Sequence, residues 1–85
     1  MGAAENLRGY KSYSWLVQDE RLLGGRLAVR GTRMPVALIL ELLASGWTAD
    51  DLEAEYPGWP RESMHDILAA AAELAEQARL PGGAA

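Results

Sequence analysis

Few side chains in this sequence are of a type that could carry out a reaction. The chain contains no cysteine and a single histidine, His65, so it cannot assemble the cysteine and histidine ligands that hold most protein-bound zinc ions. An acidic run at residues 50–55 resembles a pair of catalytic carboxylates, but helix capping and solvation explain it adequately. We therefore predict a protein that is not an enzyme and that uses no metal and no cofactor.

The glycine-containing segments Gly24-Gly25 and Gly31-Thr32 are candidates for binding phosphate through backbone amides. A phosphate loop needs glycines and a lysine at fixed spacing, and neither segment has that pattern. We interpret both segments as turns.

Charge is distributed unevenly along the chain. The net charge is −4 over 85 residues, yet residues 1–33 hold six basic and three acidic side chains, and residues 34–85 hold two basic and nine acidic ones. A negative total argues against nucleic-acid binding, because phosphates are neutralised by clustered Lys and Arg. This distribution is expected if the basic first part and the acidic second part of the chain bind different partners, or if the basic part of one subunit contacts the acidic part of another. It is equally expected of ordinary solvated charges.

The length limits the fold to one small domain. Domains of this size are commonly stabilised by disulfides, metals or a second subunit. Since this chain has no cysteine for a disulfide and too few ligands for a metal, we expect a homodimer or a higher homo-oligomer. The first residues lack the pattern of a signal peptide, and the longest apolar stretch, residues 34–40, is far shorter than the roughly 20 residues of a membrane span. We expect a cytoplasmic protein without membrane contact.

The first third of the chain predicts two short strands after an irregular segment. Residues 1–14 show no period, so we predict a flexible N-terminal arm, whose aromatic residues suit packing on the domain itself or docking on a partner. We predict strands at about residues 15–17 and 26–29, with a turn at Gly24-Gly25. Two short strands are marginally stable alone, so pairing with strands of another subunit would complete a sheet.

We predict three helices, at about residues 35–45, 49–56 and 61–79. Residues 80–85 are predicted to be a disordered tail. Pro35 suits the first position of a helix, and Gly46 suits a left-handed cap at its end. Thr48 and Asp51 have the spacing of a capping box for the second helix. The short turn between the second and third helices matches the organisation of a helix-turn-helix domain, which would span residues 15–79.

In a helix-turn-helix domain the first residues of the last helix enter the major groove. Here Arg61 lies beside Glu62, and carboxylates near phosphates cost affinity. Arg61 could read a base edge or could be an ordinary solvated residue at the start of the helix. If DNA is bound, the phosphate contacts must come from the basic residues of the first third of the chain, which are Arg26, Arg30, Arg33 and, in the arm, Arg8 and Lys11.

Several motifs lie at characteristic distances along the chain. They are Gly25, the run Val29-Arg30-Gly31-Thr32-Arg33-Met34-Pro35-Val36, Gly46 with Thr48 and Asp51-Leu52, and Tyr56-Pro57. From about Trp15 to Ala75 this pattern resembles the bacterial domain of unknown function 433 family. The sequence departs from the family's pattern at Leu27, where Pro is frequent, and at Pro60, where a Ser or Thr cap is frequent.

The resemblance implies both a fold and a function. It implies a homeodomain-like helical fold, and therefore a mainly α protein in which a short N-terminal β-hairpin precedes a three-helix homeodomain-like helix-turn-helix bundle. It also implies an antitoxin role in VapB-like systems, as in the family members studied functionally. The partner there is a PIN-like ribonuclease toxin, and the antitoxin commonly represses its own operon through the helix-turn-helix.

The motif that carries the resemblance also has a physical explanation. Gly31 permits a tight exit from a strand, Thr32 can bond backbone groups freed there, and Pro35 fixes the start of a helix. Arg33 would pair with carboxylates of the acidic half, and the alternative is that Arg33 binds a ligand directly. The predicted structural motif consists of Gly31, Thr32, Arg33, Pro35, Gly46, Tyr56 and Pro57.

Two hypotheses for the function follow. In the first, the chain is an antitoxin-like, dimeric helix-turn-helix protein that binds a PIN-like toxin and operator DNA. In the second, it is a dimeric protein-interaction module that does not bind DNA.

Overall fold

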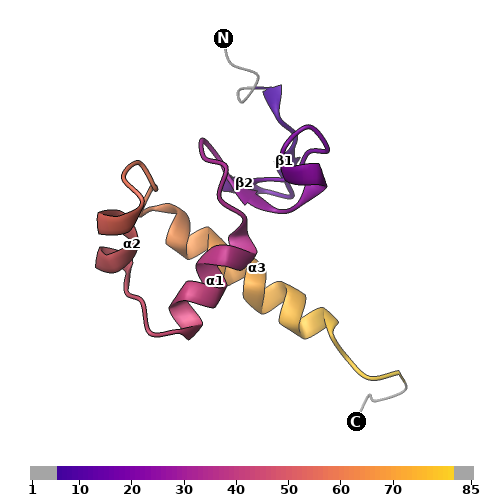
Figure 1. Ribbon diagram of the computed structural model, residues 1–85. Helices are drawn as coiled ribbons and strands as arrows, with labels where there is room; N and C mark the ends of the chain where they lie inside the picture. The colour runs from indigo at the N-terminus through magenta and orange to yellow at the C-terminus, as the bar shows by residue number, and fades with distance from the viewer. Residues whose placement is uncertain (1–5, 82–85) are drawn as a thin grey trace.

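The sheet comes first along the chain and the helices follow it (Figure 1). The structure, a computed structural model, describes residues 6–81. Its elements are β1 (Gly9–Tyr10), β2 (Tyr13–Val17), the 3-10 helix η2 (Leu23–Gly25), β3 (Ala28–Val29), α1 (Val36–Ala44), α2 (Ala49–Glu55) and α3 (Ser63–Gln77). Residues 1–5 of the predicted arm and residues 82–85 of the predicted tail lie outside the described residues.

The fold is a small mixed α/β domain. Three strands form one antiparallel sheet in the order β1-β2-β3, and three helices follow. The prediction of a mainly α fold, with a β-hairpin ahead of a homeodomain-like three-helix bundle, is therefore wrong. The physical reason is that residues predicted to belong to an arm supply an edge strand, so β2 is paired on both sides within one chain. The sheet is thus a layer of the domain rather than an appendage.

Strand β1 shows no sequence signal because it is two residues long, and so short a strand has no alternation of polar and apolar side chains. Tyr10 pairs with Tyr13 across a turn in which Lys11 has a left-handed conformation, with φ of 51°. The rings of Tyr10 and Tyr13 stack with their centroids 5.9 Å apart, and both pack against the core. These aromatic residues of the predicted arm therefore pack on the domain itself.

The two faces of β2 contribute to two apolar clusters. Leu16 is fully buried in the main core with Ile39 of α1, Leu52 of α2 and Ile67 of α3. Val17 is fully buried in a second cluster, because neighbouring residues of a strand point to opposite faces of the sheet. The second cluster consists of Val17, Leu22 and Ala28. Strand β2 is therefore covered on both faces and lies at the centre of the fold.

The end of α1 is a Schellman cap. Gly46 has φ of 99°, its amide donates to the carbonyl of Leu43, and the amide of Trp47 donates to the carbonyl of Leu42. This is the left-handed cap that the sequence predicts at Gly46. Pro35 lies one position earlier than expected, at the N-cap rather than within the helix.

Helix α2 begins with the predicted capping box, which is confirmed. The amide of Thr48 donates to Asp51 Oδ2 at 2.8 Å, and the amide of Asp51 donates to Thr48 Oγ1 at 3.2 Å. The helix ends at Glu55, one residue before the predicted end. Helix α3 begins at Ser63, two residues after the predicted start.

Two carboxylates tie α3 to the sheet. The amide of Trp15 in β2 donates to Asp66 Oδ2 at 3.0 Å. The Lys11 ammonium and the Tyr13 hydroxyl, both of the β1–β2 hairpin, donate to the two oxygens of Glu73 at 2.8 and 2.9 Å. The hydrogen bond from Lys11 lowers the pKa of Glu73 and raises that of Lys11. Asp66 and Glu73 are two helical turns apart and so share one face, which means that part of the acidity of α3 serves the sheet.

Asp19 organises the start of the connection that follows β2. Its carboxylate accepts hydrogen bonds from the Arg21 guanidinium at 2.8 and 2.9 Å and from the amides of Arg21 and Arg8, each at 2.9 Å. The side-chain hydrogen bond from Arg21, followed by the two backbone amides, holds the pKa of Asp19 well below its usual range. Ionised Asp19 therefore stabilises the folded chain.

We expect Asp19→Asn to lower the urea midpoint of unfolding at neutral pH, because the amide has no charge and a single acceptor oxygen. A depressed pKa in the folded state means that the stabilisation is present above the unfolded pKa of about 4 and is lost as the pH falls below it. The difference in midpoint between wild type and variant should therefore shrink from pH 7 to pH 3. Glu20→Gln, at the exposed neighbour, is the control, and a difference independent of pH would contradict this account.

Candidate functional site

The predicted DNA-contacting residue Arg61 is engaged within the chain. Its Nη1 donates to Asp50 Oδ1 at 2.7 Å and to Glu53 Oε1 at 3.1 Å, both on α2. The hydrogen bond with Asp50, followed by the charge of Glu53, raises the pKa of Arg61. Ser63, which begins α3, is fully buried. The Arg61 guanidinium is thus already paired with carboxylates of α2, and the Ser63 side chain does not reach the surface.

Three of the other predicted DNA-contacting residues are held by hydrogen bonds within the chain. Lys11 is paired with Glu73, and the Nε atoms of Arg8 and Arg30 donate to the carbonyls of Gln18 and Ser14 at 3.0 and 2.7 Å. The guanidinium groups of Arg26 and Arg33 make no hydrogen bond or salt bridge within residues 6–81. The expected pairing of Arg33 with the acidic half is therefore not found in the described part of the chain.

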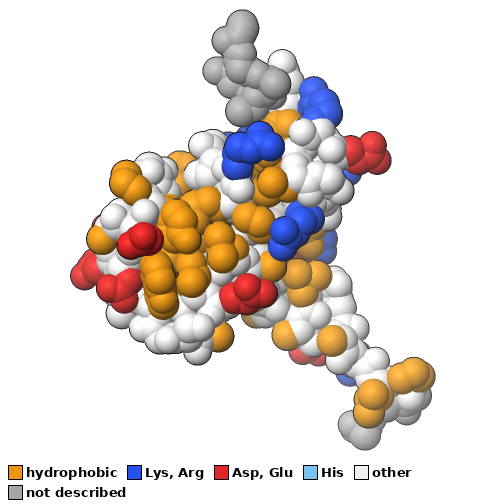
Figure 2. Space-filling model, viewed as in Figure 1, with side chains coloured by type: hydrophobic (Ala, Val, Ile, Leu, Met, Phe, Trp, Pro, Cys, Tyr) orange, Lys and Arg blue, Asp and Glu red, His pale blue; other side chains and the backbone are white. Residues whose placement is uncertain are grey.

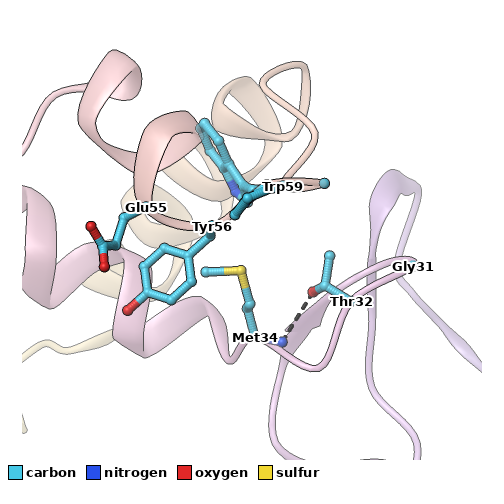
Figure 3. Close-up of a pocket in the computed structure, with 8 residues that line it drawn as sticks. Gly31, Thr32, Met34, Glu55, Tyr56 and Trp59 are labelled. Carbon is cyan, nitrogen blue, oxygen red and sulfur yellow. Dashed lines mark hydrogen bonds between the residues drawn. The ribbon is translucent and has the colours of Figure 1, made fainter.

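The two motifs that carry the family resemblance meet in one groove. Gly31 and Thr32, in the loop after β3, lie across a cavity of about 350 Å³ from Tyr56 and Pro57, in the connection between α2 and α3 (Figure 3). The other lining residues are Met34, Glu55, Gly58 and Trp59. We refer to the space lined by these eight residues as the groove.

The loop that forms one wall of the groove is held by Thr32. The chain turns at Gly31, with φ of 83°, and returns so that the amide of Val29 donates to the carbonyl of Met34 at 3.0 Å. Thr32 Oγ1 donates to the carbonyl of Val29 at 2.8 Å and accepts from the amide of Met34 at 3.0 Å. Thr32 therefore closes the loop, as the structural interpretation of the motif expects.

The floor of the groove is apolar and aromatic. Trp59 is only 4% exposed, and Tyr56 and Met34 are half-buried and pack against the core. Figure 3 shows the Met34 side chain extending from the loop toward Tyr56 and Trp59. The indole Nε1 of Trp59 is buried and has no hydrogen-bond partner within the described residues. Buried donors are usually paired, so this N–H is an uncommon feature of the groove.

A second hollow, of about 370 Å³, adjoins the groove. It is lined by Trp47, Asp51, Ala54 and Glu55, and Glu55 also lines the groove. The ring centroids of Trp47 and Tyr56 are 6.3 Å apart, which links the aromatic side chains of the two spaces. Figure 2 shows an apolar patch over the region between α1 and α2, with acidic side chains at its edges. The two spaces thus belong to one apolar surface bordered by carboxylates.

His65 lies on the exposed side of α3, with its Nδ1 3.5 Å from Asp66 Oδ1. Between residues 6 and 81 no three side chains of His, Cys, Asp or Glu lie close enough together to hold a metal ion. Within the same span, no helix combines the length and the apolar character that crossing a bilayer requires.

A comparison with protein-family models matches residues 16–71 to the family described as Protein of unknown function (DUF433). This match covers well over half of the 85 residues. The chain belongs to the DUF433 family. Separate searches of curated proteins and of solved structures found no match.

The groove lies wholly inside the segment that matches the DUF433 family, because its lining residues run from Gly31 to Trp59. Both ends of the fold extend beyond that segment. Strand β1 and the first residues of β2 precede residue 16, and the end of α3, with Glu73 that holds the β1–β2 hairpin, follows residue 71.

Five of the eight residues that line the groove belong to the motifs singled out in the sequence, namely Gly31, Thr32, Met34, Tyr56 and Pro57. Glu55, Gly58 and Trp59 lie outside those motifs. A tryptophan in a short turn is a signal that was available, because so large an apolar side chain must be covered by another part of the chain. Gly46, also in the predicted motif, lies apart from the groove as the cap of α1.

We expect Thr32→Val, a nearly isosteric change, to reduce the free energy of unfolding by about 1–2 kcal/mol, since the amide of Met34 loses its acceptor. Urea denaturation measures the loss, and hydrogen exchange at the amide of Met34 should accelerate. Ser12→Ala, at an exposed serine of the β1–β2 turn, should stay within about 0.5 kcal/mol of wild type. Equal stability of the two variants would show that Thr32 does not close the loop.

Proposed function

We propose that this DUF433 protein is a protein-interaction module of the antitoxin type, and that the groove is where it holds a PIN-like ribonuclease partner. The observation that carries the proposal is that two motifs far apart in the chain line one groove at the surface, the first through Gly31, Thr32 and Met34 and the second through Tyr56 and Pro57. The conformation of the loop after β3 explains the presence of Gly31 and Thr32, and the turn after α2 explains Pro57. Neither local conformation explains why the two motifs lie on one open surface.

The character of the surface favours a protein partner over a small molecule. Small-molecule sites are usually enclosed cavities, whereas protein-binding sites are broad, apolar at the centre and polar at the rim. Here Trp47, Tyr56 and Met34 are half-buried, and the exposed acids Asp51 and Glu55 stand at the edge. Aromatic side chains of this kind often supply most of the binding energy of an interface.

Operator DNA is not part of the proposal. The arginine at the start of α3 is neutralised by Asp50 and Glu53, and the hairpin lysine by Glu73. Arg8 and Arg30 keep their charge but have Nε held by a backbone carbonyl, so Arg26 and Arg33 are the predicted contacts whose guanidinium groups have no partner within residues 6–81. DNA affinity depends on the number of phosphate contacts. The arrangement of charges therefore gives more support to protein binding without DNA.

The proposal is tested by Ala54→Trp, which fills the second hollow from an exposed position of α2 and leaves the core untouched. Binding to a PIN-like ribonuclease partner should weaken about tenfold to a hundredfold, since a centrally placed side chain then blocks the contact. Calorimetry with the two purified proteins measures the affinity, and ribonuclease inhibition should fall in parallel.

The matched control for that experiment is Ser12→Trp, at an exposed position of the turn between β1 and β2. It adds the same side chain far along the chain from the groove and should bind as wild type does. The proposal is wrong if Ala54→Trp binds as tightly as wild type, or if the wild-type chain forms no complex with the ribonuclease.

The proposal includes a homodimer that forms through the C-terminal half of α3. Ala70 is the last buried residue of this helix, and Figure 1 shows the helix extending beyond the other elements. Among residues 6–81, the exposed large apolar side chains are Leu68, Leu74 and Leu80. Leu68 and Leu74 flank a strip of alanines on α3, whereas Leu80 lies beyond the last residue of the helix. A second copy whose helix packs on that strip would cover both Leu68 and Leu74.

Light scattering should show a dimer of the wild-type chain at micromolar concentration and a monomer of the double variant Leu68→Lys, Leu74→Lys. The helical circular dichroism of the variant should remain, because both leucines are exposed in the single chain. Gln77→Lys, another added lysine on α3, should stay dimeric. A stable wild-type monomer at these concentrations would count decisively against the dimer.

A further inference from the structure

We propose that the partner places an arginine side chain in the second hollow, against the ring of Trp47 and the carboxylates of Asp51 and Glu55, with Tyr56 of the groove beside it. This inference rests on the proposed function, because it names the chemistry of the partner segment that the same surface receives.

The acidic residues of α2 fall on two sides of the helix, and one side already holds a guanidinium. Asp50 and Glu53 both bind Arg61 of the same chain, at 2.7 and 3.1 Å. Asp51 and Glu55 are four residues apart, so they share a different side, the one that lines the second hollow. The same short helix therefore presents one pair of carboxylates with an arginine and one pair without.

The carboxylates at the hollow have acceptor capacity to spare. Glu55 makes no hydrogen bond or salt bridge within residues 6–81 and is exposed. Asp51 uses Oδ2 to accept from the amide of Thr48, and its Oδ1 has no partner in the same range. Neither carboxylate is neutralised by a basic side chain of the described chain, so both are available to a cation that a partner brings.

The aromatic rings select arginine over other cations. Trp47 and Tyr56 lie with their ring centroids 6.3 Å apart and their planes 30° apart, at the junction of the hollow and the groove. A cation is attracted to the face of an aromatic ring, and the planar guanidinium can stack on the ring while its N–H groups reach a carboxylate. A lysine ammonium lacks the plane and stays more strongly hydrated.

The groove next to the hollow accommodates the chain on either side of that arginine. Its apolar floor, Met34 with Tyr56 and Trp59, suits an apolar side chain. The chemistry of the site thus describes a segment in which arginine lies close to an apolar residue.

The test is a titration of the full 15N-labelled chain with N-acetyl-arginine methylamide, followed by NMR. The indole N–H signal of Trp47, assigned with Trp47→Phe, and the amide signals of Glu55 and Tyr56 should shift and saturate, with a dissociation constant on the order of millimolar. The neutral isostere N-acetyl-citrulline methylamide and the lysine analogue should bind more weakly, by about threefold or more.

The matched variants are Glu55→Gln and Glu76→Gln, which remove one negative charge each, at the hollow and on the exposed side of α3. Only Glu55→Gln should weaken the arginine probe. Equal shifts with arginine and citrulline, or no saturation with arginine, would overturn the inference. So would a probe that converts the wild-type dimer to a monomer in light scattering, because a second copy of the chain would then occupy the hollow.

Two outcomes separate this inference from the proposed function. If the ribonuclease complex forms and is unaffected by Glu55→Gln, and the probe does not discriminate, the arginine site fails and the proposed function stands. If the probe binds selectively but no ribonuclease complex forms, the proposed partner is wrong and the hollow remains a site for arginine.

Discussion

The packing of α3 against β2 is the interaction on which the rest of this structure depends. Leu16 and Ile67 are fully buried where the two elements meet, and Asp66 and Glu73 bond the strand and its hairpin beside that contact. Burial of apolar surface supplies the stabilisation, and the two carboxylates give the contact a defined register. Because Asp66 and Glu73 face the sheet, the number of acidic residues in α3 overstates the negative charge that the helix exposes to a partner.

The position of the groove follows from this contact. Strand β3 pairs with β2, so the loop after β3 has a defined place relative to the helices. Helix α2 is placed by its buried Leu52 and by the pairing of Arg61 with its acids, and the connection that follows α2 then lies beside the loop. The groove is a consequence of how the sheet and helices meet, so its walls come from segments that lie far apart in sequence. The proposed partner therefore binds at the boundary of two layers.

Local interactions account for what the sequence predicts well. The cap at Gly46 and the capping box of Thr48 and Asp51 each join residues no more than five positions apart in the sequence. The first sets where α1 ends and the second where α2 begins. The features that the sequence did not predict depend on contacts between residues far apart in the chain. Strand β1 exists because Gly9 and Tyr10 pair with β2, and no pattern within two residues announces that pairing. Asp66 and Glu73 look like solvated charges in sequence, and their partners are about 50 and 60 residues away.

The sequence by itself determined membership of the DUF433 family, the three helices, the main turns and the uneven charge, because each depends on residue types at short spacing. Only the tertiary structure decided that the fold is mixed α/β, that Arg61 is bound by acids of α2, and that Thr32 and Tyr56 line one groove. These are properties of contacts between distant segments. Such contacts depend on which apolar faces bury one another, and a helical or strand pattern specifies a face without specifying its partner.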